Sequence, residues 1–156
     1  MAALPRFAMA TGLLLSLAGC GVEPGPEDLR KLARPGSPNN YLICRSGLCA
    51  ALADEDGPYY DLPPERLLAV VRRVAAAQKN TVASGEDPGI NQLVFVQRTA
   101  WLRFPDIVRV QTIKAPDGRT ALAVYSQSVY GYFDFGANKS RARSWLRAIK
   151  AELGKG

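Results

Sequence analysis

The apolar residues of this chain recur with two periods, and each period predicts a different element. Between Glu65 and Gln78 an apolar side chain returns every three or four residues, which places the set on one face of a helix. Its members are Leu67, Leu68, Val71, Val74 and Ala75. The same spacing returns near the C-terminus at Ala142, Trp145, Leu146, Ile149 and Leu153. We therefore predict two amphipathic helices, with Pro64 near the first position of the earlier one.

Three β-rich runs lie between the two predicted helices. They span Gln92 to Leu102, Asp106 to Lys114 and Thr120 to Ser128, and the middle run alternates with the period of two that a strand requires. The turn APDGR joins the second and third runs as a hairpin, because Pro116 presets one dihedral angle and Asp117-Gly118 tolerate left-handed ones. We predict an α+β domain in the order helix, three strands, helix. Two helices pack a small antiparallel sheet of three strands or slightly more.

Residues 125–145, YSQSVYGYFDFGANKSRARSW, must reverse the chain between the last strand and the last helix. Gly131 and Gly136 supply dihedral angles that other residues resist, and Asp134 is placed to accept hydrogen bonds from turn amides. Asn138 precedes the periodic apolar set, as a helix N-cap does. Four aromatic residues are expected to cover the end of the core: Tyr130, Tyr132, Phe133 and Phe135.

Residues 1–19 carry one cation and an apolar run from Phe7 to Ala18, which is typical of a secretory signal. The run is too short for a permanent span, which takes roughly 20 apolar residues. Leu17-Ala18-Gly19-Cys20 resembles the lipobox of bacterial lipoproteins. This resemblance implies cleavage before Cys20 and a lipid on its thiol, and the alternative is an ordinary signal with an accidental cysteine. Gly21 follows where an aspartate would retain the protein in the inner membrane, which favours the outer membrane, facing the periplasm.

Three segments follow from this reading of the chain. Residues 1–19 form the lipoprotein signal peptide, and residues 20–36, punctuated by proline and glycine, form a lipidated flexible tether. Residues 37–156 form a single domain, which is of ordinary size for one core.

Lipid on Cys20 leaves Cys44 and Cys49 as a pair. Ser46-Gly47 supplies a turn within CRSGLC, so an oxidising envelope would join the two thiols in a structural disulfide. A redox-active pair is the alternative, although thioredoxin-type motifs place only two residues between their cysteines. Structural zinc needs four nitrogen or sulfur ligands, and the chain has no histidine. We therefore predict neither a metal nor a cofactor.

Almost all of the net charge of +6 lies in the last helix. After Ala137 the basic residues are Lys139, Arg141, Arg143, Arg147, Lys150 and Lys155, against Glu152 alone. Four of them, Lys139, Arg143, Arg147 and Lys150, form a stripe beside the apolar face. This stripe is either a solvated flank that suits the helix dipole or a surface for anionic envelope lipids or another envelope protein. An exported protein does not meet nucleic acid, so we expect no nucleic-acid partner.

The final strand, corner and helix carry a motif of polar and glycine residues. It consists of Ser126, Ser128, Gly131, Asp134, Gly136, Asn138 and Arg141. This motif resembles the signature of the family called domain of unknown function 1499. SPNN at Ser37 and RTAWLRFPDIVRV resemble its opening and its central strand pair, so the likeness extends from Ser37 to Leu153. The resemblance implies no activity, but it makes the motif and Asp106 candidates for lining a pocket.

The chain departs from the family pattern at several places. The family usually carries arginines where this chain has Tyr125 and Val129. It also has an acidic cluster where this chain keeps Asp106 but has Ile107 and Arg109. If those charges form a ligand or metal site in relatives, this chain has lost much of it.

Two functional hypotheses follow. The first is an envelope-anchored lipoprotein with a noncatalytic binding or interaction domain, whose partner is the membrane through its lipid anchor. The second is a hydrolase-like enzyme that uses Asp134 as acid or base with Ser126 or Ser128 as nucleophile. A serine nucleophile needs an activating base, and no motif here supplies a lysine or carboxylate for that role. A carboxylate pair of Asp106 and Asp134 depends on their separation. The first hypothesis is therefore favoured.

Overall fold

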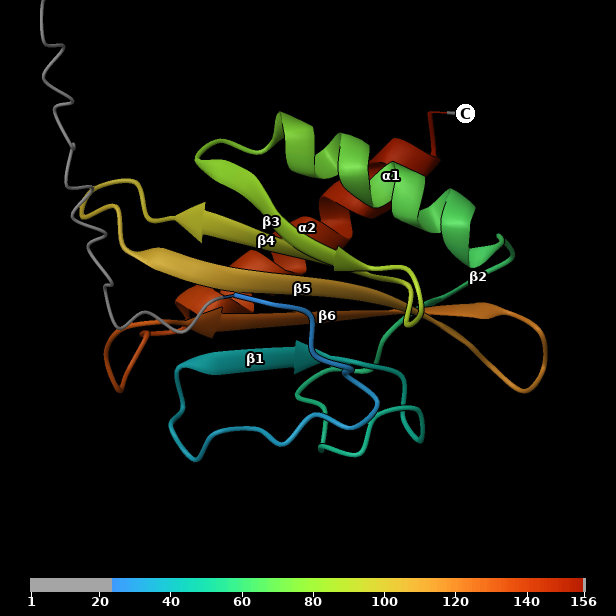
Figure 1. Cartoon of the computed structure of the whole chain (residues 1–156), viewed down its shortest axis with the longest axis horizontal. Helices are drawn as coiled ribbons and strands as arrows, with labels where there is room; N and C mark the ends of the chain where they lie inside the picture. Colours follow the sequence, from blue (N-terminus) through green and yellow to red (C-terminus); the bar gives the residue numbers. More distant parts are fainter. Residues whose placement is uncertain (1–23, 156) are drawn as a thin grey trace, which may run out of the picture.

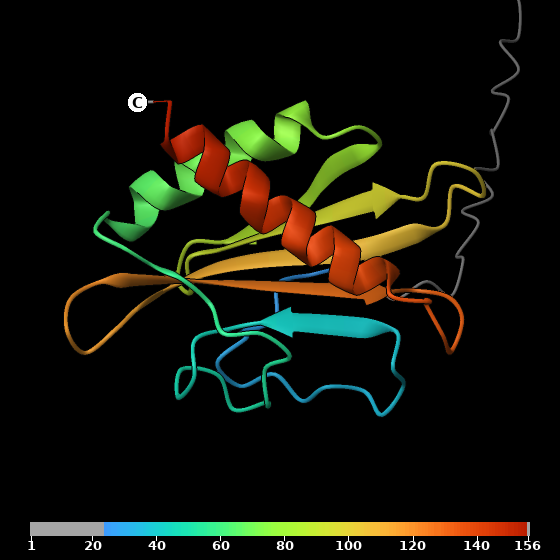
Figure 2. The ribbon, with the colours of Figure 1, turned by 180° about the vertical axis from the view of Figure 1, so that it is seen from behind.

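The computed structural model describes residues 24–155, so the predicted signal peptide and Cys20 lie outside the described residues. The elements follow one another along the chain as β1 (Asn40–Ile43), β2 (Tyr59–Tyr60), α1 (Pro64–Ala77), β3 (Thr81–Asp87), β4 (Gln92–Arg98), β5 (Pro105–Lys114), β6 (Thr120–Ser128) and α2 (Ala137–Leu153). The strands form one antiparallel sheet in the order β1-β6-β5-β4-β3, and β2 pairs with β6 beyond β1. Both helices cover one face of this sheet, and the N-terminal segment crosses the other face (Figure 1, Figure 2).

The predicted α+β class and both helices are confirmed, but the predicted sheet of three strands is too small. The three expected runs are β4, β5 and β6, and three further strands complete a six-stranded sheet. β3 was expected to be a connection, because its sequence TVASGED lacks alternation. It is an exposed edge strand with a bulge between Ala83 and Gly85, so no buried face imposes a pattern on it. β1 and β2 are too short to show a period.

The main core lies between the helices and the sheet. Val108 and Val110 of β5 and Val124 of β6 point to this face, where they meet Leu67 and Val71 of α1. Fully burying such a side chain contributes about 1.5–3 kcal/mol. Trp145 of α2 is also fully buried, and its ring lies 5.0 Å from that of Phe95. Its indole nitrogen donates to Gln97 at 3.0 Å, which satisfies the polar end of the side chain.

A second core covers the opposite face of the sheet. Leu29 and Leu32 of the N-terminal segment are buried there with Leu42, Ile113 and Tyr125. We expected residues 20–36 to be a flexible tether, but residues 24–36 follow the surface of the domain. The physical reason is that Leu29 and Leu32 pack against an apolar face of the sheet. The proline and glycine content of the segment does not reveal this contact.

Two buried glutamines fix the path of this segment. The backbone amide of Glu27 donates to Gln92 at 2.8 Å, and that of Leu29 donates to Gln111 at 2.7 Å. Gln92 returns a hydrogen bond to the Glu27 carbonyl at 2.7 Å. The backbone of the segment is therefore held in register with β4 and β5, much as an additional element of the fold would be.

The packed segment gives a direct prediction about stability. Replacing Leu29 by Ala empties a fully buried site and should lower the free energy of unfolding by about 2–5 kcal/mol. Leu52→Ala is the matched control, because Leu52 is 89% exposed and its loss should change stability by less than about 0.5 kcal/mol. Urea unfolding of the two variants makes the comparison. If Leu29→Ala and Leu52→Ala unfolded at the same urea concentration, residues 24–36 would be a free tether that is not packed on the domain.

Candidate functional site

The polar motif residues gather where β6 ends and α2 begins. Asn138 lies at their centre with none of its surface exposed. Its side-chain oxygen accepts a hydrogen bond from the Ser126 hydroxyl at 2.7 Å. Its amide nitrogen lies 2.9 Å from the Ser128 hydroxyl and 2.7 Å from the carbonyl of Asn39, just before β1. One side chain of α2 thus joins the helix to β6 and to the start of β1.

A buried ion pair forms the second half of this network. Arg141 of α2 pairs with Asp106 at the start of β5, and the two side chains are 11% and 5% exposed. The guanidinium also donates to the Ser126 hydroxyl at 3.0 Å and to the Asn138 oxygen at 2.7 Å. Burial raises the pKa of Asp106, which the charge of Arg141 and a hydrogen bond from Ser128 partly offset. We call Asp106, Ser126, Ser128, Asn138 and Arg141 the polar clasp.

Asp134 organises the turn that precedes the helix. Its carboxylate accepts hydrogen bonds from the backbone amides of Gly136 at 2.9 Å and Asn138 at 2.8 Å. Although burial alone would raise the pKa of Asp134, these hydrogen bonds lower it below its ordinary value. The expected turn role of Asp134 agrees with this geometry.

The helix begins differently from the prediction. Gly136 occupies the N-cap position in the left-handed conformation, with φ of 81°. Asn138, predicted as the N-cap, lies inside the first turn with its side chain in the polar clasp. The position was misassigned because an asparagine before an apolar set is typical of a cap, and only the fold shows that this one is buried. Gly131, with φ of 85°, is another left-handed residue of the corner.

The hydroxyls of the two motif serines are both engaged within the polar clasp. Ser126 is fully buried, and its hydroxyl is shared between Asn138 and Arg141, neither of which accepts its proton as a base. The Ser128 hydroxyl lies between Asn138 and the buried carboxylate of Asp106, which is paired with Arg141. Asp134 uses its oxygens on backbone amides. The geometry therefore favours a structural connection over nucleophilic catalysis.

Two departures from the family pattern face each other in the sheet. Arg109 of β5 is paired with Tyr125 of β6, and both side chains are buried under the N-terminal segment. Arg109 donates to the Gly25 carbonyl at 3.1 Å and lies 3.6 Å from the carboxylate of Glu27. Burial raises the pKa of the Tyr125 hydroxyl to about 12. These positions hold the segment and lie apart from the polar clasp.

The predicted basic stripe of α2 is partly neutralised. Arg143 donates to Glu55 at 2.6 Å, whereas Lys139, Arg147 and Lys150 are exposed and form no ion pair within residues 24–155. The predicted disulfide is present, joining Cys44 to Cys49. Within the same residues, no cluster of potential metal ligands is found. No helix of the described part is long and apolar enough to cross a membrane.

The aromatic residues of the corner do not cover the core. The exposed fractions are 60% for Tyr130, 61% for Tyr132, 66% for Phe133 and 100% for Phe135. The expectation is wrong because the polar clasp and Trp145 already close this end of the core, so the corner loop projects outward. Trp101 was predicted to lie in the first β-rich run, Gln92 to Leu102, but β4 ends at Arg98 and Trp101 is 95% exposed in the loop between β4 and β5.

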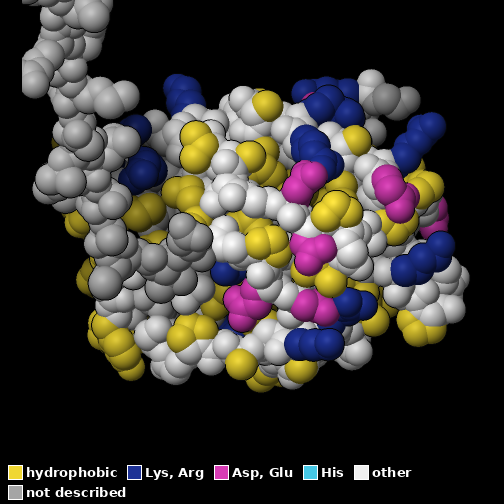
Figure 3. Space-filling model, viewed as in Figure 1, with side chains coloured by type: hydrophobic (Ala, Val, Ile, Leu, Met, Phe, Trp, Pro, Cys, Tyr) yellow, Lys and Arg dark blue, Asp and Glu magenta, His cyan; other side chains and the backbone are white. Residues whose placement is uncertain are grey.

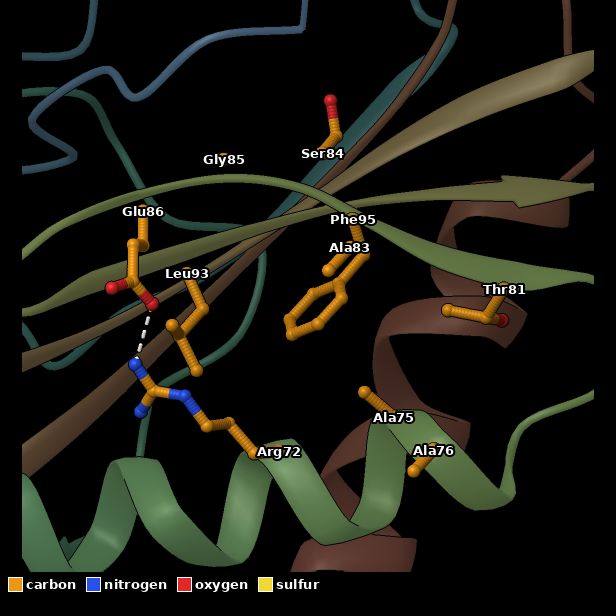
Figure 4. A pocket seen from close by; sticks show the side chains of 10 residues that line it. All are labelled: Arg72, Ala75, Ala76, Thr81, Ala83, Ser84, Gly85, Glu86, Leu93 and Phe95. Atoms are coloured by element: carbon orange, nitrogen blue, oxygen red, sulfur yellow. Dashed lines mark hydrogen bonds and ion pairs between the residues drawn. The ribbon is translucent and has the colours of Figure 1, made fainter.

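An apolar groove of about 510 Å³ lies between α1 and β3. Leu93 and Phe95 of β4, which are themselves buried in the main core, form its floor, and small residues of the two flanking elements line its walls: Ala75, Ala76, Ala83 and Gly85 (Figure 4). Arg72 and Glu86 meet across it at 2.5 Å. The two charges satisfy each other, so the lining suits an apolar ligand better than a charged one.

A comparison with protein families places these features in a known group. A family model described as "Protein of unknown function (DUF1499)" matches residues 45–149, which is more than half of the chain. The matched range holds every residue of the polar clasp and the Asp134 turn. The predicted family resemblance is thereby confirmed for the domain. No curated protein matches the sequence.

Asp134 gives a prediction that separates a turn role from catalysis. Removing its carboxylate with Asp134→Ala should cost about 0.5–2 kcal/mol of unfolding free energy at neutral pH. Because the folded pKa of Asp134 is lowered, its contribution is present above the unfolded value of about 3.9 and disappears as the pH falls through the folded value. Urea unfolding of both proteins should therefore show a difference that shrinks below about pH 4. Asp134→Asn, which keeps one acceptor oxygen, should lose less, and an Ala variant as stable as the parent would exclude the turn role.

Proposed function

The chain belongs to the family of proteins of unknown function DUF1499, and from its own residues we propose that it is a lipid-anchored envelope lipoprotein with a noncatalytic binding domain. The single observation that carries the noncatalytic role is the polar clasp. Its serines, asparagine and ion pair are hydrogen-bonded to one another, and Ser126 and Asn138 are fully buried, which supports a structural role over chemistry on a substrate. The hydrolase alternative finds no base in reach of Ser126.

The location rests on two features that support each other. Cys20 closes a pattern resembling the lipobox, which attaches a protein to the membrane through acyl chains. Cys44 and Cys49 form a disulfide, and disulfides persist in oxidising compartments such as the bacterial periplasm. With Gly21 after the cysteine, we propose the outer membrane, with the domain facing the periplasm.

The binding role rests on what the fold exposes. The groove between α1 and β3 offers an apolar floor to a ligand, and two loops at one end of the sheet present aromatic side chains to solvent. We propose that the domain uses such surfaces on lipids or on another envelope protein. The free cations Lys139, Arg147 and Lys150 favour an anionic partner over a basic one.

Mass spectrometry of protein extracted from membranes tests this proposal. The mature chain should begin at Cys20 and carry acyl chains, and Cys44 and Cys49 should resist alkylation until a reductant is added. Cys20→Ser should abolish the acylated species and release the protein from the membrane fraction, while Cys49→Ser should leave acylation unchanged. An unmodified Cys20 in protein from the parent chain would contradict the anchor.

The noncatalytic assignment has its own readout in the same preparation. A fluorophosphonate reagent, which labels activated serine nucleophiles, should not modify Ser126 or Ser128. Labelling of the parent that disappears in Ser128→Ala would instead support the hydrolase.

A further inference from the structure

Two loops meet at one end of the sheet and carry exposed aromatic side chains. Arg98 is paired with Pro105 and Ser128 with Asp106, so the β4–β5 loop and the β6–α2 loop leave the sheet at the same end (Figure 1, Figure 2). The backbone amide of Val129 also reaches the Pro105 carbonyl at 3.4 Å. We call these exposed residues the aromatic end: Trp101, Leu102, Phe104, Tyr130, Tyr132, Phe133 and Phe135.

The aromatic end is far more exposed than folding requires. Its members range from 47% exposed for Phe104 to 100% for Phe135. Two pairs among them are in contact, since the rings of Phe104 and Tyr130 lie 6.0 Å apart and those of Tyr132 and Phe133 lie 4.8 Å apart. Large exposed apolar side chains gathered at one end of a fold are typical of an interaction site.

Phe135 shows that this exposure serves something other than stability. Its φ of 52° lies in the left-handed region, where a residue with a β-carbon is strained. Its side chain is wholly exposed, so no packing compensates for that strain. Glycine would adopt this conformation more easily. A phenylalanine at this point therefore benefits a surface and not the core.

The charges around the aromatic end favour a membrane with anionic lipids. Arg98, Arg103 and Lys139 lie at or beside the two loops, and none forms an ion pair within residues 24–155. In Figure 3 the visible acidic side chains lie at the centre and right of the face. At its left end, where the loops lie in Figure 1, grey atoms cover much of the surface, and the coloured side chains visible between them are hydrophobic and basic. The acidic residue of the β6–α2 loop, Asp134, is engaged with the backbone amides of Gly136 and Asn138. Tryptophan and tyrosine with flanking cations are the composition that proteins place at the headgroup level of a bilayer.

A basic hollow beside these loops fits the same partner. It has a volume of about 420 Å³, and its charged lining residues are Lys79, Arg98 and Arg141, with no carboxylate among its walls. Arg141 is already paired with Asp106, which leaves Lys79 and Arg98 to face the hollow as cations. The negative charge of a lipid phosphate group would complement these cations.

The N-terminal segment crosses the outer face of the sheet at the level of Arg109. The backbone amide of Leu29 donates to Gln111 of β5, and the Gly25 carbonyl accepts from Arg109. The Pro24 carbonyl then accepts a hydrogen bond from Ser84 of β3 at 3.2 Å. Cys20 precedes Pro24 by four residues, which reach at most about 14 Å, and the four residues from Arg109 to Pro105 span about 13 Å. The chain is therefore long enough for Cys20 to reach the level of the aromatic end.

We infer that the aromatic end inserts into the interface of the bilayer that holds the lipid anchor, with anionic headgroups against its cations. This inference rests on the proposed anchor at Cys20 for its geometry. The aromatic loops give the domain a second attachment point, so the domain stands on the membrane in one orientation. The apolar groove between α1 and β3 and the later cations of the α2 stripe, Arg147 and Lys150, then remain exposed to the periplasm.

Tryptophan fluorescence tests the inference on the acylated protein. The chain has Trp101, which is 95% exposed, and Trp145, which is fully buried. The protein is reconstituted into vesicles of phosphatidylethanolamine and phosphatidylglycerol, with and without bromine on the acyl chains. We expect brominated lipid to quench Trp101 and its emission to shift to shorter wavelength. Trp101→Phe is the control, because the remaining emission from Trp145 should not be quenched.

A second pair of variants separates insertion from folding. Phe135→Gly removes a ring that the fold does not need, so the unfolding temperature should stay equal or rise while most of the quenching of Trp101 is lost. Leu52→Gly removes another strongly exposed apolar side chain, which lies just after the disulfide loop and is 89% exposed, and should leave quenching intact.

The outcomes distinguish this inference from the anchor proposal. Acylated protein that is bound to vesicles but shows Trp101 open to acrylamide and untouched by brominated lipid overturns the inference and leaves the anchor standing. If the purified protein carries no acyl chains, the anchor proposal is wrong. Quenching of its Trp101 by brominated lipid would still support insertion of the aromatic end, and the absence of quenching would contradict it. Trp101 that is shielded in native membranes but unquenched in pure lipid vesicles would assign the aromatic end to a protein partner, and the inference would be wrong.

Discussion

The structure depends on a buried ion pair whose charges and polar atoms must all find partners inside the protein. Asp106 belongs to strand β5 and Arg141 to helix α2, two elements that are distant in the chain. Burying either charge without the other would be strongly destabilising. Their pairing requires α2 to begin at one place and to lie at one angle over β5 and β6. Asn138 and Ser126 satisfy the remaining polar atoms, and through Asn39 the arrangement reaches β1. The network thus determines how the last helix docks.

The remaining features follow from this docking. Because Asp134 and Gly136 start the helix next to the polar clasp, the corner loop has no room on the core and projects outward with its aromatic side chains. The opposite face of the sheet is closed by the N-terminal segment, so neither broad face of β5 is free. Surfaces that remain open on the described residues include the edge groove beside β3 and the aromatic end. In this chain the family signature builds the scaffold, and the proposed binding surfaces lie mainly outside it.

The sequence predicted the helices from their period and the central strands from their β-rich runs. Both helices carry an apolar repeat of 3.6 residues, whereas β4, β5 and β6 are buried along most of their length on both faces. β5 and β6 lie within one residue of their expected bounds, but β4 ends at Arg98, before the predicted Leu102. β3 was missed because an exposed edge strand with a bulge has no buried face to impose alternation. The packing of Leu29 and Leu32 was missed because it depends on the shape of a distant sheet surface.

The motif residues were found by their pattern, but their contacts were not. The pairing of Asp106 with Arg141 could not be read from residue spacing, because it depends on how α2 packs over β5 in the folded protein. Composition led us to expect Tyr130, Tyr132, Phe133 and Phe135 inside, because aromatic residues usually contribute to cores. These four side chains are exposed because Trp145 already fills this end of the core.

The most direct test of the account is a double-mutant cycle on the buried pair. Asp106→Leu and Arg141→Met should each lower the free energy of unfolding by about 3–5 kcal/mol, since each leaves an unpaired buried charge. The double variant should lose clearly less than the sum of the two, with a coupling energy of at least about 1 kcal/mol. Losses that simply add would mean that the two residues act independently, which would contradict the clasp as the constraint that positions α2.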